Sequence, residues 1–170
     1  GEDYFDGHVR FTADNRYLLA TQTEAATGQG YIGIYDAADQ FRFLTKWYTG
    51  GMDPHELALM ADGKTLVVAN GGYLKAGVDD KPLNPSEMQS NLVYLELATG
   101  KVLDCYMPPS PLMSMRHLAV SPANEVIIGV QYHGNKFDDV PLILGHKGEN
   151  TLQAYNASSE VYASFSHYIA

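Results

Sequence analysis

The chain has 170 residues, of which 45% are hydrophobic and 18% are charged, and its formal net charge is -9. This composition excludes a disordered polypeptide and predicts one folded domain over residues 1–170 with a core of its own. The negative charge excludes nucleic acid as a natural partner, and no apolar run is long enough to span a membrane.

Three segments share one pattern: an apolar strand, a tight turn, and a second strand rich in β-branched or aromatic residues. They are residues 8–21, 56–69 and 117–130. Their turns contain Asp, Asn or Gly, which tolerate the positive φ angles of tight hairpins. A second hairpin is predicted after each one, over residues 31–48, 91–107 and 151–166.

Each unit is therefore predicted to contain four short antiparallel strands, which is typical of a β-propeller blade. We predict an all-β fold, a β-propeller of four-stranded antiparallel blades over residues 7–49, 54–108 and 115–166. Residues 1–6 are interpreted as the tail of a preceding blade and residues 167–170 as the start of another. Helical periodicity is missing throughout, and a β-sandwich is the structural alternative.

Three blades do not close a ring, because propellers typically have about four to eight. We expect the chain to be a piece of a longer protein or to associate with a second copy. Either arrangement would cover the open sheet faces and edges at the two ends of the set.

The first strand of each propeller blade lines the central channel, so residues that enter these strands meet at one rim. His8, Glu56 and His117 occupy one equivalent position of the three units, and His55 and Arg116 occupy the position before it. We expect these five side chains to converge.

Three interpretations of this rim stay open. The side chains can have a structural role, since buried polar groups need hydrogen-bond partners. His8, His55 and His117 are suitable ligands for a divalent ion of zinc, iron or copper, although no local motif such as HExxH is present. Alternatively, the rim binds an organic anion and Arg116 holds its carboxylate.

Residues outside the rim give weaker signals. Two long loops, over residues 70–90 and 131–150, are predicted to connect the second and third strands of their blades. Each contains Asp-Asp-x-Pro-Leu, whose Asp pairs are interpreted as turn residues. His133 and His146, which lie in the second segment, are expected to be solvated. The one cysteine, Cys105, is expected to be a buried and inert thiol.

The stretches "PHELALMADGKTLVVANGG", "YLELATGKVL" and "MRHLAVSPANEVIIGVQYHG" resemble an uncharacterised bacterial propeller family, a domain of unknown function whose members are mostly exported by the twin-arginine route. The resemblance covers nearly the whole chain. It implies a seven-bladed, YVTN-like propeller of the quinoprotein amine dehydrogenase type in the periplasm, of which this chain would hold about three blades. Neighbouring genes for imelysin-like and di-haem proteins imply an iron-uptake or metal-uptake context, and no catalytic residues are established for the family.

We therefore expect a periplasmic binding or scaffold module rather than an enzyme. Its partner would be a protein or a small ligand, and its candidate cofactor is a divalent metal ion. The alternative is a metal-dependent hydrolase or lactonase-like enzyme in which Glu56 is a ligand or general base. A redox accessory protein that holds or passes a metal is a third possibility.

Overall fold

The computed structural model describes residues 3–74, 87–135 and 138–155. Within these ranges, twelve β-strands form three four-stranded antiparallel sheets and no α-helix is present. The same ranges accordingly hold no helix with the length and apolar character needed to cross a membrane. The predicted fold class is confirmed: the chain is a partial β-propeller of three blades.

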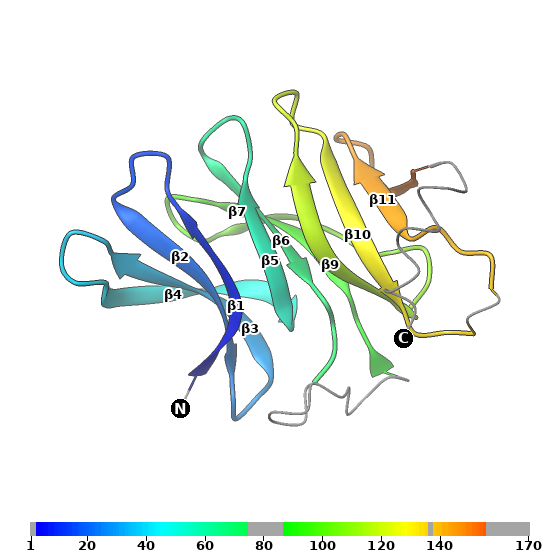
Figure 1. Ribbon diagram of the computed structural model, residues 1–170, viewed down its shortest axis with the longest axis horizontal. Coiled ribbons are helices and arrows are strands. Elements are labelled where there is room, and N and C mark those ends of the chain that lie inside the picture. Colours follow the sequence, from blue (N-terminus) through cyan, green and yellow to red (C-terminus); the bar gives the residue numbers. More distant parts are fainter. Residues whose placement is uncertain (1–2, 75–86, 136–137, 156–170) are drawn as a thin grey trace.

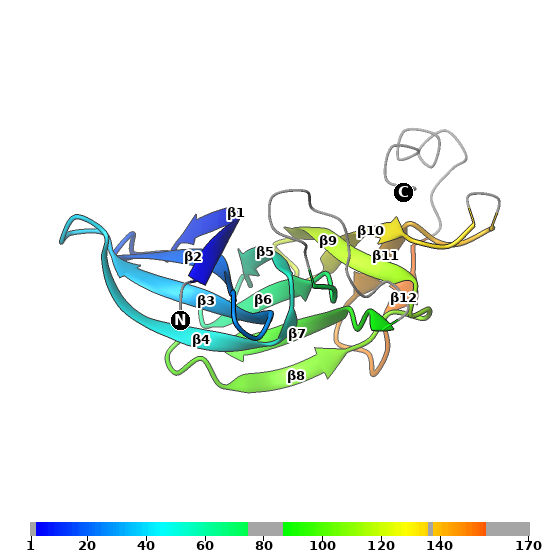
Figure 2. The same cartoon turned by 90° about the horizontal axis from the view of Figure 1, so that it is seen from below.

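Each blade is a meander in which neighbouring strands pair in chain order. Blade 1 contains β1 (Asp3–Phe11), β2 (Tyr17–Glu24), β3 (Gln29–Asp36) and β4 (Arg42–Met52). Blade 2 contains β5 (Pro54–Leu59), β6 (Thr65–Asn70), β7 (Asn91–Glu96) and β8 (Val102–Tyr106). Blade 3 contains β9 (Met113–Val120), β10 (Val126–Tyr132), β11 (Ile143–His146) and β12 (Gln153–Ala154). The blades lie side by side, and their inner strands β1, β5 and β9 are neighbours (Figures 1 and 2).

The turns between the first two strands of each blade lie where the sequence predicts them. Asn15, Gly63 and Asn124 have φ angles of 57°, 65° and 61°. These are residue types that enter the left-handed region most readily. Asp14 and Asp62 stabilise their turns by accepting a hydrogen bond from the backbone N–H two residues later, at 3.0 and 2.8 Å.

Two apolar cores fill the spaces between the blades, because side chains along a strand alternate between the two faces of its sheet. The core between blades 1 and 2 contains Leu19, Ile32, Ile34, Leu57, Leu66, Val68, Val93 and Leu95. The core between blades 2 and 3 contains Met60, Val67, Ala69, Leu92, Tyr94, Met113, Met115, Val126, Ile128, Val130, Tyr132, Leu142, Leu144 and Leu152. Burial of these faces fixes the blades against one another and so places the three inner strands at one edge.

Two expectations about strand positions are wrong. Residues 3–6 do not belong to a preceding blade, because β1 begins at Asp3 and that residue pairs with Glu24 of β2. The segment 131–150 is not one continuous loop, because residues 143–146 form β11, whose apolar side chains are buried.

Three expectations lie wholly or partly outside the described residues. They are the Asp pair at residues 79 and 80, most of the hairpin predicted over 151–166, and the blade start predicted over 167–170. The second Asp pair is described: Asp138 accepts hydrogen bonds from the Tyr132 hydroxyl at 2.6 Å and from the Asn135 backbone N–H at 3.1 Å. These short-range contacts are typical of a turn residue.

The outer strands and the outer face of blade 1 are exposed. Cys105 lies on β8, the last strand of blade 2, and is exposed there, so the expectation of a buried thiol is wrong.

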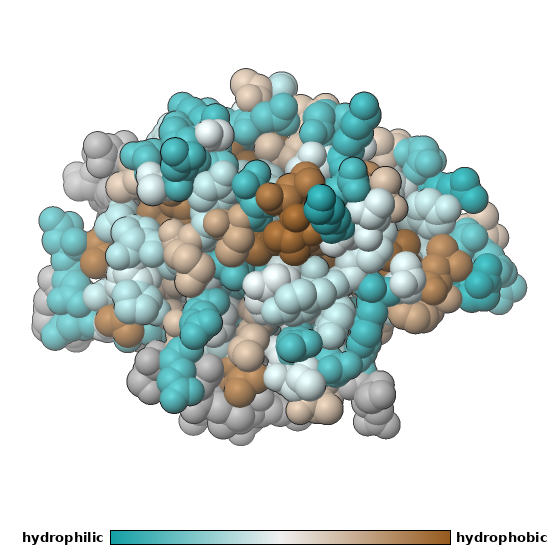
Figure 3. Space-filling model, turned by 180° about the vertical axis from the view of Figure 1, so that it is seen from behind, coloured by the Kyte–Doolittle hydropathy of each residue, from teal (hydrophilic) through white to brown (hydrophobic). Residues whose placement is uncertain are grey.

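The outer face of blade 1, turned away from blade 2, carries the exposed aromatic residues Phe5, Phe11 and Phe43. Seen from behind, the molecule is largely hydrophilic with a hydrophobic patch near the middle (Figure 3).

Candidate functional site

A β-bulge interrupts the pairing of each inner strand at the rim position. In β1, residues 6–8 lie opposite the single residue Thr21 of β2. In β5, His55 is the extra residue, and in β9 both Arg116 and His117 lie opposite one residue of β10. A bulge leaves a residue out of the ladder and turns its side chain, and bulges are common beside binding sites.

The bulge of β1 has its own supporting contacts. Gly7 has a φ angle of 96°, which favours glycine. The Thr21 hydroxyl accepts a hydrogen bond from the His8 backbone N–H at 3.3 Å and donates one to the His8 carbonyl at 3.2 Å. The hydroxyl therefore replaces the ladder bonds that the bulge removes and holds His8 in place.

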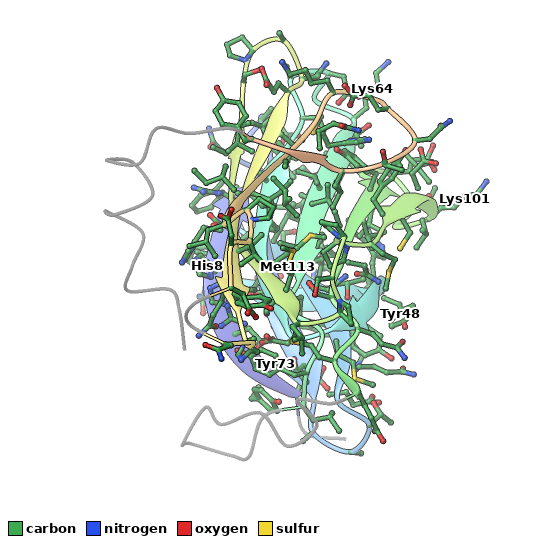
Figure 4. All side chains as sticks on the ribbon, turned by 90° about the vertical axis from the view of Figure 1, so that its right-hand side faces the viewer. His8, Tyr48, Lys64, Tyr73, Lys101 and Met113 are labelled. Carbon is green, nitrogen blue, oxygen red and sulfur yellow. The ribbon has the colours of Figure 1, made fainter. Side chains whose placement is uncertain are left out.

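The three bulges bring three imidazole rings together. The ring centres of His8 and His55 are 5.1 Å apart, those of His55 and His117 are 4.9 Å apart, and those of His8 and His117 are 5.6 Å apart. Figure 4 shows His8 on the side of the inner strands, opposite Tyr48 and Lys101 on the side of the outer strands. The rim histidines thus form one cluster, with one ring from each blade.

Glu56 braces this cluster from the buried side. Glu56 is buried, with 7% of its surface exposed. Its Oε1 accepts a hydrogen bond from Arg10 Nη2 at 3.1 Å, and its Oε2 accepts one from the Leu118 backbone N–H at 3.0 Å. The same Oε2 lies 3.1 Å from His117 Nδ1. When Nδ1 carries the proton and donates a hydrogen bond to this carboxylate, the lone pair of His117 is on Nε2.

The cluster offers a set of metal-ligating atoms. One ligand atom each of His8, Glu56 and His117 lies within 4.8 Å of the other two. Ligand atoms of one tetrahedral zinc ion are about 3.3 Å apart, given bonds of about 2.0–2.1 Å, so these side chains would have to move closer together to bind one ion. In addition, His8 Nδ1 is buried and has no hydrogen-bond partner among the described residues. An orphaned buried nitrogen is uncommon and fits a site for an ion.

Arg116 lies beside the cluster and is engaged by a buried acid. Its Nη1 donates a hydrogen bond to Asp53 Oδ2 at 2.5 Å, and its guanidinium lies over the Tyr73 ring at 5.3 Å. Asp53 is 1% exposed and has a positive φ of 52°. The charge of Arg116 is therefore balanced within the protein. His133 packs with its ring edge on against Tyr73, and burial, assisted by the Arg116 charge, lowers its pKa.

His146 is a buried structural residue, so the expectation that it is solvated is wrong. It ends β11 and is 5% exposed. The Tyr94 hydroxyl donates to its Nδ1 at 2.6 Å, and its Nε2 donates to the Glu149 carbonyl at 2.8 Å. Its ring packs on Tyr106 with centres 4.2 Å apart. Both ring nitrogens are thus satisfied, and burial raises the pKa of Tyr94.

Sequence reasoning missed three supporting residues: Arg10, Thr21 and Asp53. Arg10 lies two residues after His8 in the same strand, and Asp53 lies two residues before His55, so both were close to the predicted position. Their roles depend on contacts to other blades or strands, which the local pattern does not contain.

Comparisons with known proteins give a family and a fold. A family model described as "Protein of unknown function (DUF1513)" matches residues 2–170. Among solved structures, the chain is similar to Kuenenia stuttgartiensis hydrazine synthase, with 12% sequence identity and a TM-score of 0.48. That match covers 81% of this chain and 48% of the other, so this chain spans about half the length of that one. The search of curated proteins gave no match.

Proposed function

This chain belongs to the DUF1513 family, and we propose that it is a β-propeller binding module that holds one divalent transition-metal ion between its inner strands. We further propose a periplasmic location and a metal-uptake context, which the family resemblance supports. One observation carries the metal proposal: three imidazoles and a carboxylate from three blades meet in one cluster.

The donor chemistry supports a borderline metal. Imidazole nitrogens suit zinc, copper and iron, whereas magnesium and calcium prefer oxygen ligands throughout. Glu56 is held as an acceptor by three donors, and it provides the carboxylate partner that metal-ligating histidines commonly use. The orphaned Nδ1 of His8 gives the site a nitrogen that gains a partner when an ion binds.

Elemental analysis of protein purified without chelator tests the proposal, together with calorimetric titration of chelator-treated protein with zinc, iron(II) and copper(II). We expect close to one equivalent of one of these metals in the wild type. A His8→Ala/His117→Ala double variant should lose it, and the matched control His133→Ala, which removes a histidine outside the cluster, should keep it. Wild-type protein that contains no metal and binds none of the three would overturn the proposal.

We also propose that the outer face of blade 1 packs on a second copy of the chain. Phe5, Phe11 and Phe43 expose roughly half of their surface there, and monomers rarely leave a large apolar patch uncovered. Light scattering should give a dimer for the wild type and a monomer for a Phe5→Ser/Phe43→Ser variant. A wild type that stays monomeric at high concentration would contradict this.

A further inference from the structure

We infer that His8, His55 and His117 are the three protein ligands of this metal, that Glu56 is a positioning residue outside the coordination sphere, and that a small anion takes the remaining coordination position. The inference rests on the proposed function, because it concerns the same ion. It adds the identity of the ligands and the chemical class of the molecule that the site binds.

The ring separations fit a three-histidine centre. A metal about 2.0–2.1 Å from an imidazole nitrogen lies about 3.2 Å from the ring centre, so two rings at the tetrahedral angle have centres about 5.2 Å apart. The three separations in the cluster are 4.9, 5.1 and 5.6 Å. Three rings from three separate strands therefore already have the spacing that one ion requires.

His55 needs only a ring rotation to join. Its nitrogens do not belong to the group of ligand atoms that lie within 4.8 Å of one another, which consists of His8, Glu56 and His117. Rotation about the Cβ–Cγ bond moves the nitrogens of an imidazole much more than its centre, and this torsion is soft. The ring centre of His55 is in place, and its nitrogens can turn to the ion.

Glu56 is already committed to the protein. Its Oε1 accepts a hydrogen bond from the Arg10 guanidinium, and its Oε2 accepts hydrogen bonds from the Leu118 backbone N–H and from His117 Nδ1–H. Direct ligation would weaken these contacts in a side chain that is only 9% exposed. Left as they are, these contacts would form a carboxylate–histidine–metal arrangement once His117 binds an ion, and the carboxylate would fix the tautomer and orientation of that ligand.

The local charge and exposure then favour an anion. Arg10 offsets Glu56 and Asp53 offsets Arg116, while imidazoles that bind a metal ion through a nitrogen lone pair add no charge of their own. A divalent ion therefore leaves a local charge of about +2 on an otherwise acidic chain. His117 is 45% exposed, so solutes can reach the centre. Zinc sites with three protein ligands generally keep the fourth position for water or an exogenous ligand. A small carboxylate or another monoanion fits this position.

Cobalt(II) provides the probe, because its visible spectrum reports the ligands of the ion. We expect the wild type to bind one equivalent of cobalt(II) and its spectrum to change in a saturable manner when azide or acetate is added. Glu56→Gln should keep cobalt(II) and the azide response with about 10–100-fold weaker metal affinity, as expected for an outer carboxylate. His55→Ala should lose tight binding, and His133→Ala should match the wild type.

The outcomes separate the two proposals. If the wild type binds no metal at all, the proposed function fails. If it binds cobalt(II) but neither azide nor acetate alters the spectrum, the anion inference is overturned while the metal site stands. Equal binding by His55→Ala and the wild type, with complete loss in Glu56→Gln, would make Glu56 the ligand and overturn the assignment. Circular dichroism of each variant checks that it is folded, and His55→Gln replaces His55→Ala if the latter is not.

Discussion

Glu56 links all three blades through its hydrogen bonds, so its removal should destabilise the protein. The carboxylate belongs to β5, accepts from Arg10 of β1, and accepts from the backbone of Leu118 in β9. Replacement by alanine removes these contacts and leaves a cavity in a site that is 7% exposed. We predict that Glu56→Ala lowers the free energy of unfolding by roughly 2–4 kcal/mol.

The magnitude follows from three contributions. An unpaired N–H at Leu118 costs about 1–3 kcal/mol, because the donor loses a charged acceptor and gains no full access to water. The ion pair with Arg10 adds at most about 1 kcal/mol, since the arginine side chain is 52% exposed and solvent screens the attraction. Loss of buried methylene contacts adds about 1 kcal/mol, and partial relaxation of the site reduces the sum.

Urea unfolding followed by the fluorescence of Trp47, the one tryptophan of the chain, measures the effect. Arg10→Ala is the control that removes only the exposed partner, and it should cost at most about 1 kcal/mol. Glu56→Gln keeps the shape and one acceptor, so its cost should fall between the two. A change of less than about 0.5 kcal/mol in Glu56→Ala would refute the view that this carboxylate braces the blades.

Three further predictions concern the blades themselves. Burial raises the pKa of Tyr94, so the folded state keeps a proton that the unfolded chain loses above about pH 10. The free energy of unfolding should therefore fall as the pH rises past that value, and it should fall less in Tyr94→Phe when both proteins are unfolded in urea between pH 9 and 11. Gly100 and Gly63 both have a positive φ, but only at Gly100 would an added Cβ meet the Trp47 side chain. Gly63→Ala should therefore lower the free energy of unfolding by about 1 kcal/mol and Gly100→Ala by clearly more, and urea unfolding of the two variants measures this. Backbone hydrogen bonds lower the pKa of Asp62, so the stability that its carboxylate contributes is present above about pH 4 and is lost as the pH falls through the folded pKa. Asp62→Ala should lower the free energy of unfolding by about 1 kcal/mol at pH 7, and the variant should lose less stability than the wild type in acid.

The repeated hairpins could be predicted because their signal is local. An Asp, Asn or Gly at a tight turn and apolar residues on both sides are sufficient to define two paired strands. Alignment of the three hairpins in the sequence is sufficient to predict that His8, Glu56 and His117 share one equivalent position. In the structure these three side chains, one from each blade, lie together, so the repeat alone is sufficient to locate them.

The features that were missed depend on tertiary contacts. Strand β11 is only four residues long, so its sequence alone is too short to predict a strand. It is defined by the packing of its apolar side chains in the core between blades 2 and 3. His146 at the end of this strand was expected to be solvated, but it is buried and accepts a hydrogen bond from the Tyr94 hydroxyl. The bulges depend on strand register, which is set by pairing and by the face that is buried rather than by a residue type. Asp53 was hidden for the same reason, since its partner Arg116 is in another blade.

The equivalent positions also explain why three similar blades can build one site that is not symmetric. At the position shared by His8, Glu56 and His117, blade 2 alone has a carboxylate, and this difference supplies the brace that two histidines cannot provide. At the preceding position blade 2 has His55, which adds the third ring where blade 1 has a glycine. An exact repeat would place three like groups around the axis, with either three rings and no carboxylate partner or three carboxylates that repel one another. Small differences between blades therefore create a cluster suited to a single ion.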